Sequence, residues 1–235
     1  MEKIIVLDSS TIISLSVNCL LHYLAKLKEK SNVRFLIPPW VEDETVKAAI
    51  NSIRFRLEGI RIINEINNGT IEVIGNRNIR SNAIDILTRA NNIFYAWNSP
   101  IRLLHKGEAE VVSLCKFVNA SYIGCDEKTT RILIENSENM RRILEEKLHT
   151  SITVNKKNLS KFKEMVSGIN ILRSVDIIAT AFDIGLFNDY LRNCSGYSET
   201  IRSDFVKGTL WALRYAGCGI SEIEINNYIR YLVGR

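Results

Sequence analysis

The sequence lacks the compositional bias of disordered, collagen-like and low-complexity chains. It has only three prolines and twelve glycines among 235 residues, and 46% of its residues are hydrophobic, which is close to the average for globular proteins. It has no apolar run near the ~18 to 20 residues that a membrane span needs. The N-terminal segment MEKIIVLDSS has no basic region followed by an apolar one, so no signal peptide is predicted. We therefore expect a folded, cytoplasmic protein.

Cysteine and histidine are sparse and show no ligand spacing. The five cysteines are odd in number and contain no Cys-x-x-Cys pair, which argues against a disulfide framework and against a zinc site. The three histidines, His22, His105 and His149, are not spaced as metal ligands either.

Neither sign of charge dominates, because 31 basic and 26 acidic residues leave a net charge of +5. That charge tolerates a polyanionic partner without identifying one.

Short apolar segments alternate with helical ones along the first part of the chain. Apolar segments predict strands at Lys3–Leu7, Val33–Ile37, Thr70–Ile74, Ser121–Cys125 and Ser151–Val154. Helical patterns run over residues 11–30 and 41–66 and begin again after Gly107. Strands separated by helices are typical of a parallel sheet. The predicted fold class is therefore α/β, with a helical C-terminal extension.

The chain is longer than one typical domain, so an insert and an extension are predicted. Residues 76–106 show a weak helical pattern and are interpreted as a helical insert. After Val154 the patterns are only helical, at Leu159–Val166, Ser174–Ile184, Thr200–Tyr215 and Ser221–Val233. These helices carry more apolar positions than solvated helices do, so we expect them to pack on the preceding domain. The predicted division is a domain over residues 1–155 and an extension over residues 156–235.

Acidic residues occur where the predicted strands end and where the next helices begin. Asp8 follows the first strand, Asp126 and Glu127 follow the fourth, and Glu44 and Glu108 lie near helix starts. Ligands of an open parallel sheet bind outside the carboxyl ends of its strands, so these acids are expected at one edge. Clustered carboxylates repel one another unless a cation is present. Mg²⁺ or Mn²⁺ is the expected cation because both prefer oxygen ligands.

Each acid also has an ordinary structural explanation. Asp8 and Asp126 are typical helix caps or turn residues. Glu44 and Glu108 are first-turn acids that favour the positive end of a helix dipole. Their joint pattern, rather than any one residue, favours a metal site.

Four short motifs carry these acids in a recognisable order. They are Ile-Val-Leu-Asp8-Ser-Ser10, then Ile37-Pro-Pro-Trp-Val-Glu-Asp-Glu44, then Gly107-Glu108-Ala109-Glu110, and finally Asp126-Glu127-Lys-Thr-Thr-Arg131. At these residues the sequence resembles the PIN-domain nucleases, which include the toxins of toxin/antitoxin pairs and several RNA-processing endonucleases. Members often carry two Asp residues at the fourth motif, where this chain has Asp126 and Glu127. The resemblance covers residues 1 to about 155.

The resemblance implies a three-layer α/β/α sandwich with a parallel sheet and a metal-dependent endoribonuclease activity. It implies that Asp8, Glu44, Glu108 and Asp126 are catalytic, with Mg²⁺ or Mn²⁺ held by Asp8, Glu108 and Asp126 and with Glu127 as a spare ligand. Hydrolysis of single-stranded or structured RNA would leave 5′-phosphate and 3′-hydroxyl ends.

The resemblance also implies contacts to RNA near that edge of the sheet. The residues expected there are Ser10, Lys128 and Arg131, together with Arg54, Arg56 and Arg61, although an ordinary solvated helix face explains the last three better. Partners consistent with the family are an RNA substrate, an antitoxin protein and a second copy of the chain.

Two other functions stay open at this stage. A PIN-like scaffold that binds RNA or protein without cleaving it would fit the same fold, although the full set of acids argues against it. A doubly wound phosphatase or nucleotide-binding protein is disfavoured because the glycine motifs GxGxxG and GxxxxGK[ST] are absent.

Overall fold

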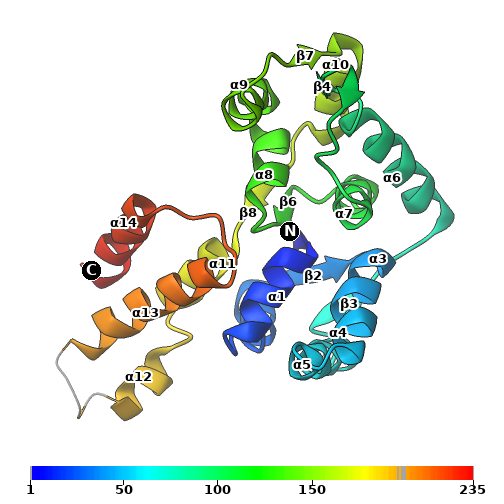
Figure 1. Cartoon of the computed structure of the whole chain (residues 1–235). Coiled ribbons are helices and arrows are strands. Elements are labelled where there is room, and N and C mark those ends of the chain that lie inside the picture. The colour runs from blue at the N-terminus through cyan, green and yellow to red at the C-terminus, as the bar shows by residue number, and fades with distance from the viewer. Residues whose placement is uncertain (1, 195, 197–199, 235) are drawn as a thin grey trace.

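The computed structural model describes residues 2–194, 196 and 200–234. It shows an α/β protein whose central sheet has five parallel strands (Figure 1). The strands lie in the order β3-β2-β1-β6-β8, with bounds β1 Lys3–Leu7, β2 Val33–Ile37, β3 Ile71–Val73, β6 Tyr122–Gly124 and β8 Asn170–Leu172. The prediction of an α/β fold with a parallel sheet is confirmed.

The order of the strands reverses at β1. From β1 the chain proceeds through β2 to β3 on one side, and it later adds β6 and β8 on the other. Leu7 of β1 pairs with Gly124 of β6, and a Cβ on Gly124 would lie only 2.6 Å from Cδ2 of Leu7. A side chain at position 124 would therefore require the side chain of Leu7 to shift. Because β1 and β6 are paired, the residues that follow them emerge side by side.

Helices cover both faces of the sheet, which is consistent with the predicted three-layer α/β/α arrangement. On one face α1 contacts α5 and α11, and α2 contacts β2. On the other face α7 contacts β1 and β6, and α8 contacts β8. The bounds of these helices are α1 Ser9–Val17, α2 Tyr23–Ser31, α5 Arg56–Asn67, α7 Lys106–Phe117, α8 Lys128–Glu135 and α11 Ser174–Asp183.

The two long predicted helices are each interrupted. Residues 11–30 form α1 and α2, separated at Cys19, whose φ is 57°. Residues 41–66 are divided further, because a π-helical turn interrupts the first part of this segment. The elements here are α3 Pro39–Glu42, the π-helical turn η1 Asp43–Lys47, α4 Ala48–Asn51 and then α5.

The predicted helical insert is only partly helical. Its first half forms α6, Arg77–Ala90, but its second half forms a hairpin of β4 Phe94–Ala96 and β5 Ser99–Pro100. The hairpin turn consists of Trp97 and Asn98, both with positive φ, as two-residue turns of type I′ require. The prediction that Ser151–Val154 is a strand is confirmed for β7, Thr153–Val154, but β7 pairs with β4 in a second, antiparallel sheet.

The C-terminal segment supplies the fifth strand of the central sheet. The prediction of only helices after Val154 is wrong here, because β8 pairs in parallel with β6. The remaining elements are helical: α9 Ser137–Leu148 and α10 Lys156–Val166 precede β8, and α12 Asn188–Cys194, α13 Ile201–Tyr215 and α14 Glu222–Val233 follow α11. Figure 1 shows α13 and α14 extending away from the sheet beyond α11.

An aromatic cluster joins the C-terminal helices to the rest of the protein. Phe187 lies with its ring centroid 4.0 Å from that of Tyr23 in α2 and 4.1 Å from that of Phe182 in α11. Phe205 of α13 packs against both phenylalanines. Helix α11 also contacts α1 and β8 directly.

In the described part of the chain, no helix combines the length and apolar character needed to cross a lipid bilayer.

Candidate active site

Three of the predicted acids line one pocket of about 410 Å³ near the carboxyl end of β1. Asp8 comes from the start of α1, Glu44 from η1 and Glu108 from the first turn of α7. We call this cavity the acid pocket. Its remaining lining residues are Ser9, Trp40, His105, Lys106 and Gly107.

Asp8 is the most deeply buried of these acids, with 3% of its surface exposed. Its Oδ2 accepts hydrogen bonds from the backbone N–H of Ser10 at 3.2 Å and from the Ser10 hydroxyl at 2.7 Å. Its other oxygen, Oδ1, is buried and has no hydrogen-bond partner. Burial raises the pKa of Asp8, and the charge of Glu44 raises it further. Asp8 therefore carries an unsatisfied oxygen that a cation would stabilise.

Glu108 is held in place by its own helix start and by α8. Its Oε2 accepts from the backbone N–H of His105, the residue before α7, and its Oε1 accepts from the Thr130 hydroxyl at 2.8 Å. Burial raises the pKa of Glu108, and the neighbouring Asp8 adds to the effect. The helix-start explanation that the sequence offered for Glu108 is thus correct, and it fixes the carboxylate beside Asp8.

Glu44 reaches the pocket from the π-helical turn. The Thr45 hydroxyl donates to the carbonyl of Val41 at 2.7 Å, within the short helical segment that contains η1. A Cβ on Gly107 would lie 3.3 Å from Oε2 of Glu44, so the absence of a side chain there leaves room for this carboxylate. Single π-helical turns of this kind are frequent at functional sites.

Asp126 lies outside the acid pocket, contrary to what its position after β6 suggests. Its two carboxylate oxygens accept from the backbone N–H and the hydroxyl of Ser174, each at 2.7 Å. Cys125 turns toward the acid pocket instead, with its Sγ 3.9 Å from Oδ2 of Asp8. Asp126 thereby anchors the start of α11, where a negative charge complements the helix dipole.

Glu127 also has a structural partner. Its side chain accepts from the backbone N–H of Thr130 and caps α8. The hydrogen bonds of Asp126 and Glu127 direct both side chains to helix starts. Of the four predicted metal ligands, the structure brings only Asp8 and Glu108 together in the acid pocket.

The pocket is open rather than a closed metal cage. Among the residues that the structure describes, no group of three Asp, Glu, His or Cys side chains is arranged to hold a metal ion. Mg²⁺ does not need such a group, because it keeps several waters and commonly uses one or two carboxylates together with substrate phosphate oxygens. The free Oδ1 of Asp8 beside the Glu108 carboxylate fits that kind of site.

Several of the predicted RNA-binding residues have partners within the protein. Ser10 is an internal bridge, since its hydroxyl donates to Asp8 and accepts from the backbone N–H of Asp126 at 3.0 Å. Arg61 donates to the carbonyl of Ser16 at the end of α1, and Arg56 donates to that of Ile50. Arg54 is exposed and lies over the ring of Phe55. Lys128 is exposed and Arg131 is half-buried at the start of α8.

Sequence patterns missed two residues in the wall of the acid pocket. Trp40 and Lys106 line it, and the ammonium of Lys106 lies 4.7 Å from the centroid of the Trp40 ring. Both residues adjoin the predicted acids in sequence, Trp40 within the second motif and Lys106 just before the third. Their position next to those motifs is the signal that would have found them.

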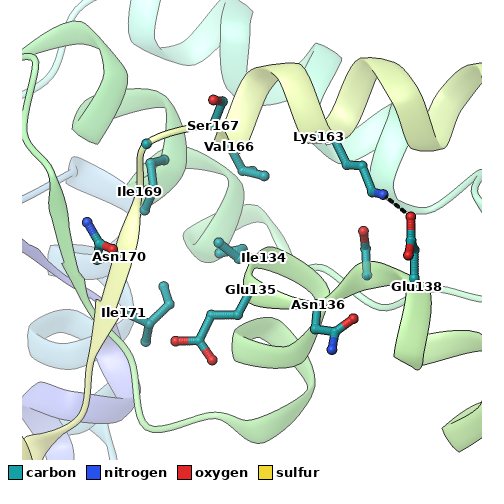
Figure 2. Close-up of a pocket in the computed structure, with 12 residues that line it drawn as sticks. Ile134, Glu135, Asn136, Glu138, Lys163, Val166, Ser167, Ile169, Asn170 and Ile171 are labelled. Atoms are coloured by element: carbon teal, nitrogen blue, oxygen red, sulfur yellow. Dashed lines mark hydrogen bonds and ion pairs between the residues drawn. The ribbon is translucent and has the colours of Figure 1, made fainter.

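A larger pocket of about 560 Å³ lies elsewhere, between β8 and helices α8, α9 and α10. Figure 2 shows its lining side chains, including Ile134, Glu135 and Asn170, and the ion pair between Lys163 and Glu138. Burial raises the pKa of Glu135 here. None of the predicted site residues lines this pocket.

Neither a family model, nor a curated protein, nor a solved structure matches the chain. The function is therefore inferred from the acid pocket itself.

Because Ser174 donates to the buried Asp126 carboxylate, we expect that removing the Ser174 hydroxyl lowers the stability of the protein. Ser174→Ala should lower the free energy of unfolding by about 1 to 3 kcal/mol, because it removes one of the two donors from a fully buried carboxylate. Urea denaturation followed by circular dichroism measures this loss. Thr180→Ala in the same helix is the matched control, since that hydroxyl is exposed and bonds only to a backbone carbonyl. Equal stability of the two variants would contradict the anchoring role.

Proposed function

We propose that the protein is a PIN-like, Mg²⁺- or Mn²⁺-dependent endoribonuclease that hydrolyses phosphodiester bonds of single-stranded RNA. The observation that carries the proposal is the acid pocket. Three carboxylates from separate segments converge beside β1, at the point where the order of the strands reverses. Ligands of open parallel sheets bind at such points. One of these carboxylates has a buried oxygen without a partner.

The electrostatics of the pocket favour a bound cation. Burial raises the pKa of both Asp8 and Glu108, and a neighbouring charge raises each pKa further, that of Glu44 for Asp8 and that of Asp8 for Glu108. Their charged forms are therefore held at a cost in free energy. A divalent cation between them would remove that cost. Asp8 and Glu108 are the residues that would hold it, with Asp8 oriented by Ser10 and Glu108 oriented by Thr130.

The chemistry requires a nucleophile, a proton acceptor and a stabilised leaving oxygen. A bound Mg²⁺ or Mn²⁺ supplies Lewis-acid stabilisation of the phosphate and makes a water molecule more acidic. Glu44, the exposed carboxylate of the pocket, would accept the proton from water. Lys106 at the same wall brings a positive charge to the substrate phosphate.

RNA cleavage tests the proposal directly. The purified protein should cleave a 5′-labelled single-stranded RNA in the presence of Mg²⁺ or Mn²⁺, and an excess of EDTA should stop the reaction. The same cations should raise the thermal midpoint of the wild-type protein, because they bind only the folded pocket. The cations should not raise the thermal midpoint of the Asp8→Asn variant. A protein that binds RNA but neither cleaves it nor responds to these cations would be a scaffold instead.

A further inference from the structure

A second cavity, of about 340 Å³, adjoins the acid pocket. Trp40 and Lys106 line both cavities and so form their common wall. We call the second cavity the Trp40 groove. Besides these two residues, it is lined by Pro39, Asp43, Arg80, Ala83, Ile84, Leu87, Ala109 and Glu110.

The groove combines an apolar surface with two cations and two carboxylates, of which Asp43 pairs with Lys47 and Glu110 pairs with Arg80. Trp40 has 41% of its surface exposed, and Ile84 of α6 has 62% exposed, so two large apolar side chains of this cavity reach solvent. The ammonium of Lys106 lies over the Trp40 ring. Arg80 adds a second cation, with 73% of its side chain exposed. A flat aromatic surface beside two positive charges matches a nucleotide, which has an aromatic base and an anionic phosphate.

The backbone that carries Trp40 is held in place before any ligand binds. The backbone N–H of Trp40 donates to Oε2 of the buried Glu110 at 3.1 Å, and Glu110 also lies 3.9 Å from the Nε of Arg80. Pro39 at the start of α3 is packed so closely against Gly75 that a Cβ on that glycine would clash with the proline ring. Because this backbone is already held, binding a base against Trp40 does not require the segment to be ordered first.

We infer that the Trp40 groove binds a base of the RNA chain by stacking it on Trp40, next to the phosphate held in the acid pocket. This inference rests on the proposed function and adds a subsite to it. Lys106 contacts the backbone between the two cavities, and Arg80 contacts the phosphate on the far side of the base. Glu110 is a positioning residue that holds Trp40 and Arg80. Stacking tolerates every base, so the groove favours unpaired RNA over duplex RNA.

The test uses binding rather than cleavage. In an Asp8→Asn background, fluorescence anisotropy measures the Kd for a labelled single-stranded RNA and for an abasic oligomer with the same number of phosphates. Adding Trp40→Ala should weaken RNA binding about 10-fold to 100-fold and leave binding of the abasic oligomer nearly unchanged. Trp40→Phe should restore most of the affinity because it restores an aromatic face.

Two further variants keep the test independent of folding. Ile84→Ala removes an exposed side chain from the groove and should weaken RNA binding without changing the thermal midpoint. Trp97→Ala is the matched control, because Trp97 is 72% exposed on the β4–β5 hairpin and does not line the groove. The inference is overturned if the Trp40→Ala variant binds RNA as tightly as the Asp8→Asn protein does. It is also overturned if Trp40→Ala weakens the binding of RNA and the binding of the abasic oligomer equally. A wild-type protein that neither binds nor cleaves RNA would overturn the proposed function as well.

Discussion

Replacing Asp8 with asparagine should lower the rate of RNA cleavage by at least ~100-fold while leaving the thermal midpoint unchanged or higher. The asparagine side chain would keep the hydrogen bonds to Ser10 and still cap α1, because asparagine is as good a cap as aspartate. It would lose the negative charge that a cation needs. The change therefore separates chemistry from folding, since the same substitution removes a metal ligand and relieves the repulsion from Glu44 and Glu108.

The stability part of this prediction has a definite dependence on pH. Because burial raises the pKa of Asp8 in the folded state, the folded protein binds its proton more tightly than the unfolded chain does. The wild type therefore loses stability as pH rises above the ordinary Asp pKa of 3.8. Asp8→Asn is free of this loss. Its advantage in thermal midpoint should be present at pH 7 and should vanish as the pH falls toward 4.

Cleavage by parallel preparations of wild type, Asp8→Asn and Asp85→Asn measures the effect on rate. Asp85 is an exposed residue of α6 that pairs with Arg89, so its neutralisation should change neither rate nor midpoint by much. Undiminished cleavage by highly purified Asp8→Asn would show that the activity belongs to a contaminating nuclease.

Truncation after Val154 should give an insoluble protein. It removes β8, which pairs with β6 at one side of the sheet, and exposes that strand as a new edge. It also removes Ser174, the partner of the buried Asp126 carboxylate. The ring of Tyr23 would lose Phe187, against which it packs. Each of these losses exposes groups that the full chain buries, and exposed apolar surface favours aggregation.

Graded truncations check this result. A chain that ends after Ala216 keeps β8, α11 and the aromatic cluster and lacks only α14 and the segment before it. We expect it to remain folded with a lower thermal midpoint, as measured by differential scanning fluorimetry after size-exclusion chromatography. If residues 1–154 instead elute as a soluble, folded and active monomer, the C-terminal helices form an independent module.

Strands β1 and β2 were predicted with their observed bounds because each is an apolar run ended by a clear signal. Asp8 follows the first, and Pro38 and Pro39 follow the second. Strand β8 was missed because it is three residues long and lies between helical patterns. Its strand conformation comes from pairing with β6, a contact between segments far apart in the chain that local propensity does not encode.

The acid pocket could be predicted in part for a similar reason. The ends of adjacent parallel strands and the helix starts beside them lie together, so Asp8, Glu44 and Glu108 could be placed near one another from chain order alone. The orientation of the Asp126 side chain could not be predicted in this way. Successive residues of an extended segment point to opposite sides, and here Cys125 turns toward Asp8 while Asp126 turns toward Ser174.

The hydroxyl of Ser10 connects the two halves of this arrangement. It donates to Asp8 and accepts from the backbone of Asp126, whose carboxylate in turn anchors Ser174 and α11. These hydrogen bonds join the acid pocket to the segment on which α11 docks, so we expect binding of a cation at Asp8 to be coupled to the packing of α11 against the sheet. Such a coupling is reciprocal: a change that tightens α11 against the sheet would tighten binding at Asp8 by the same factor.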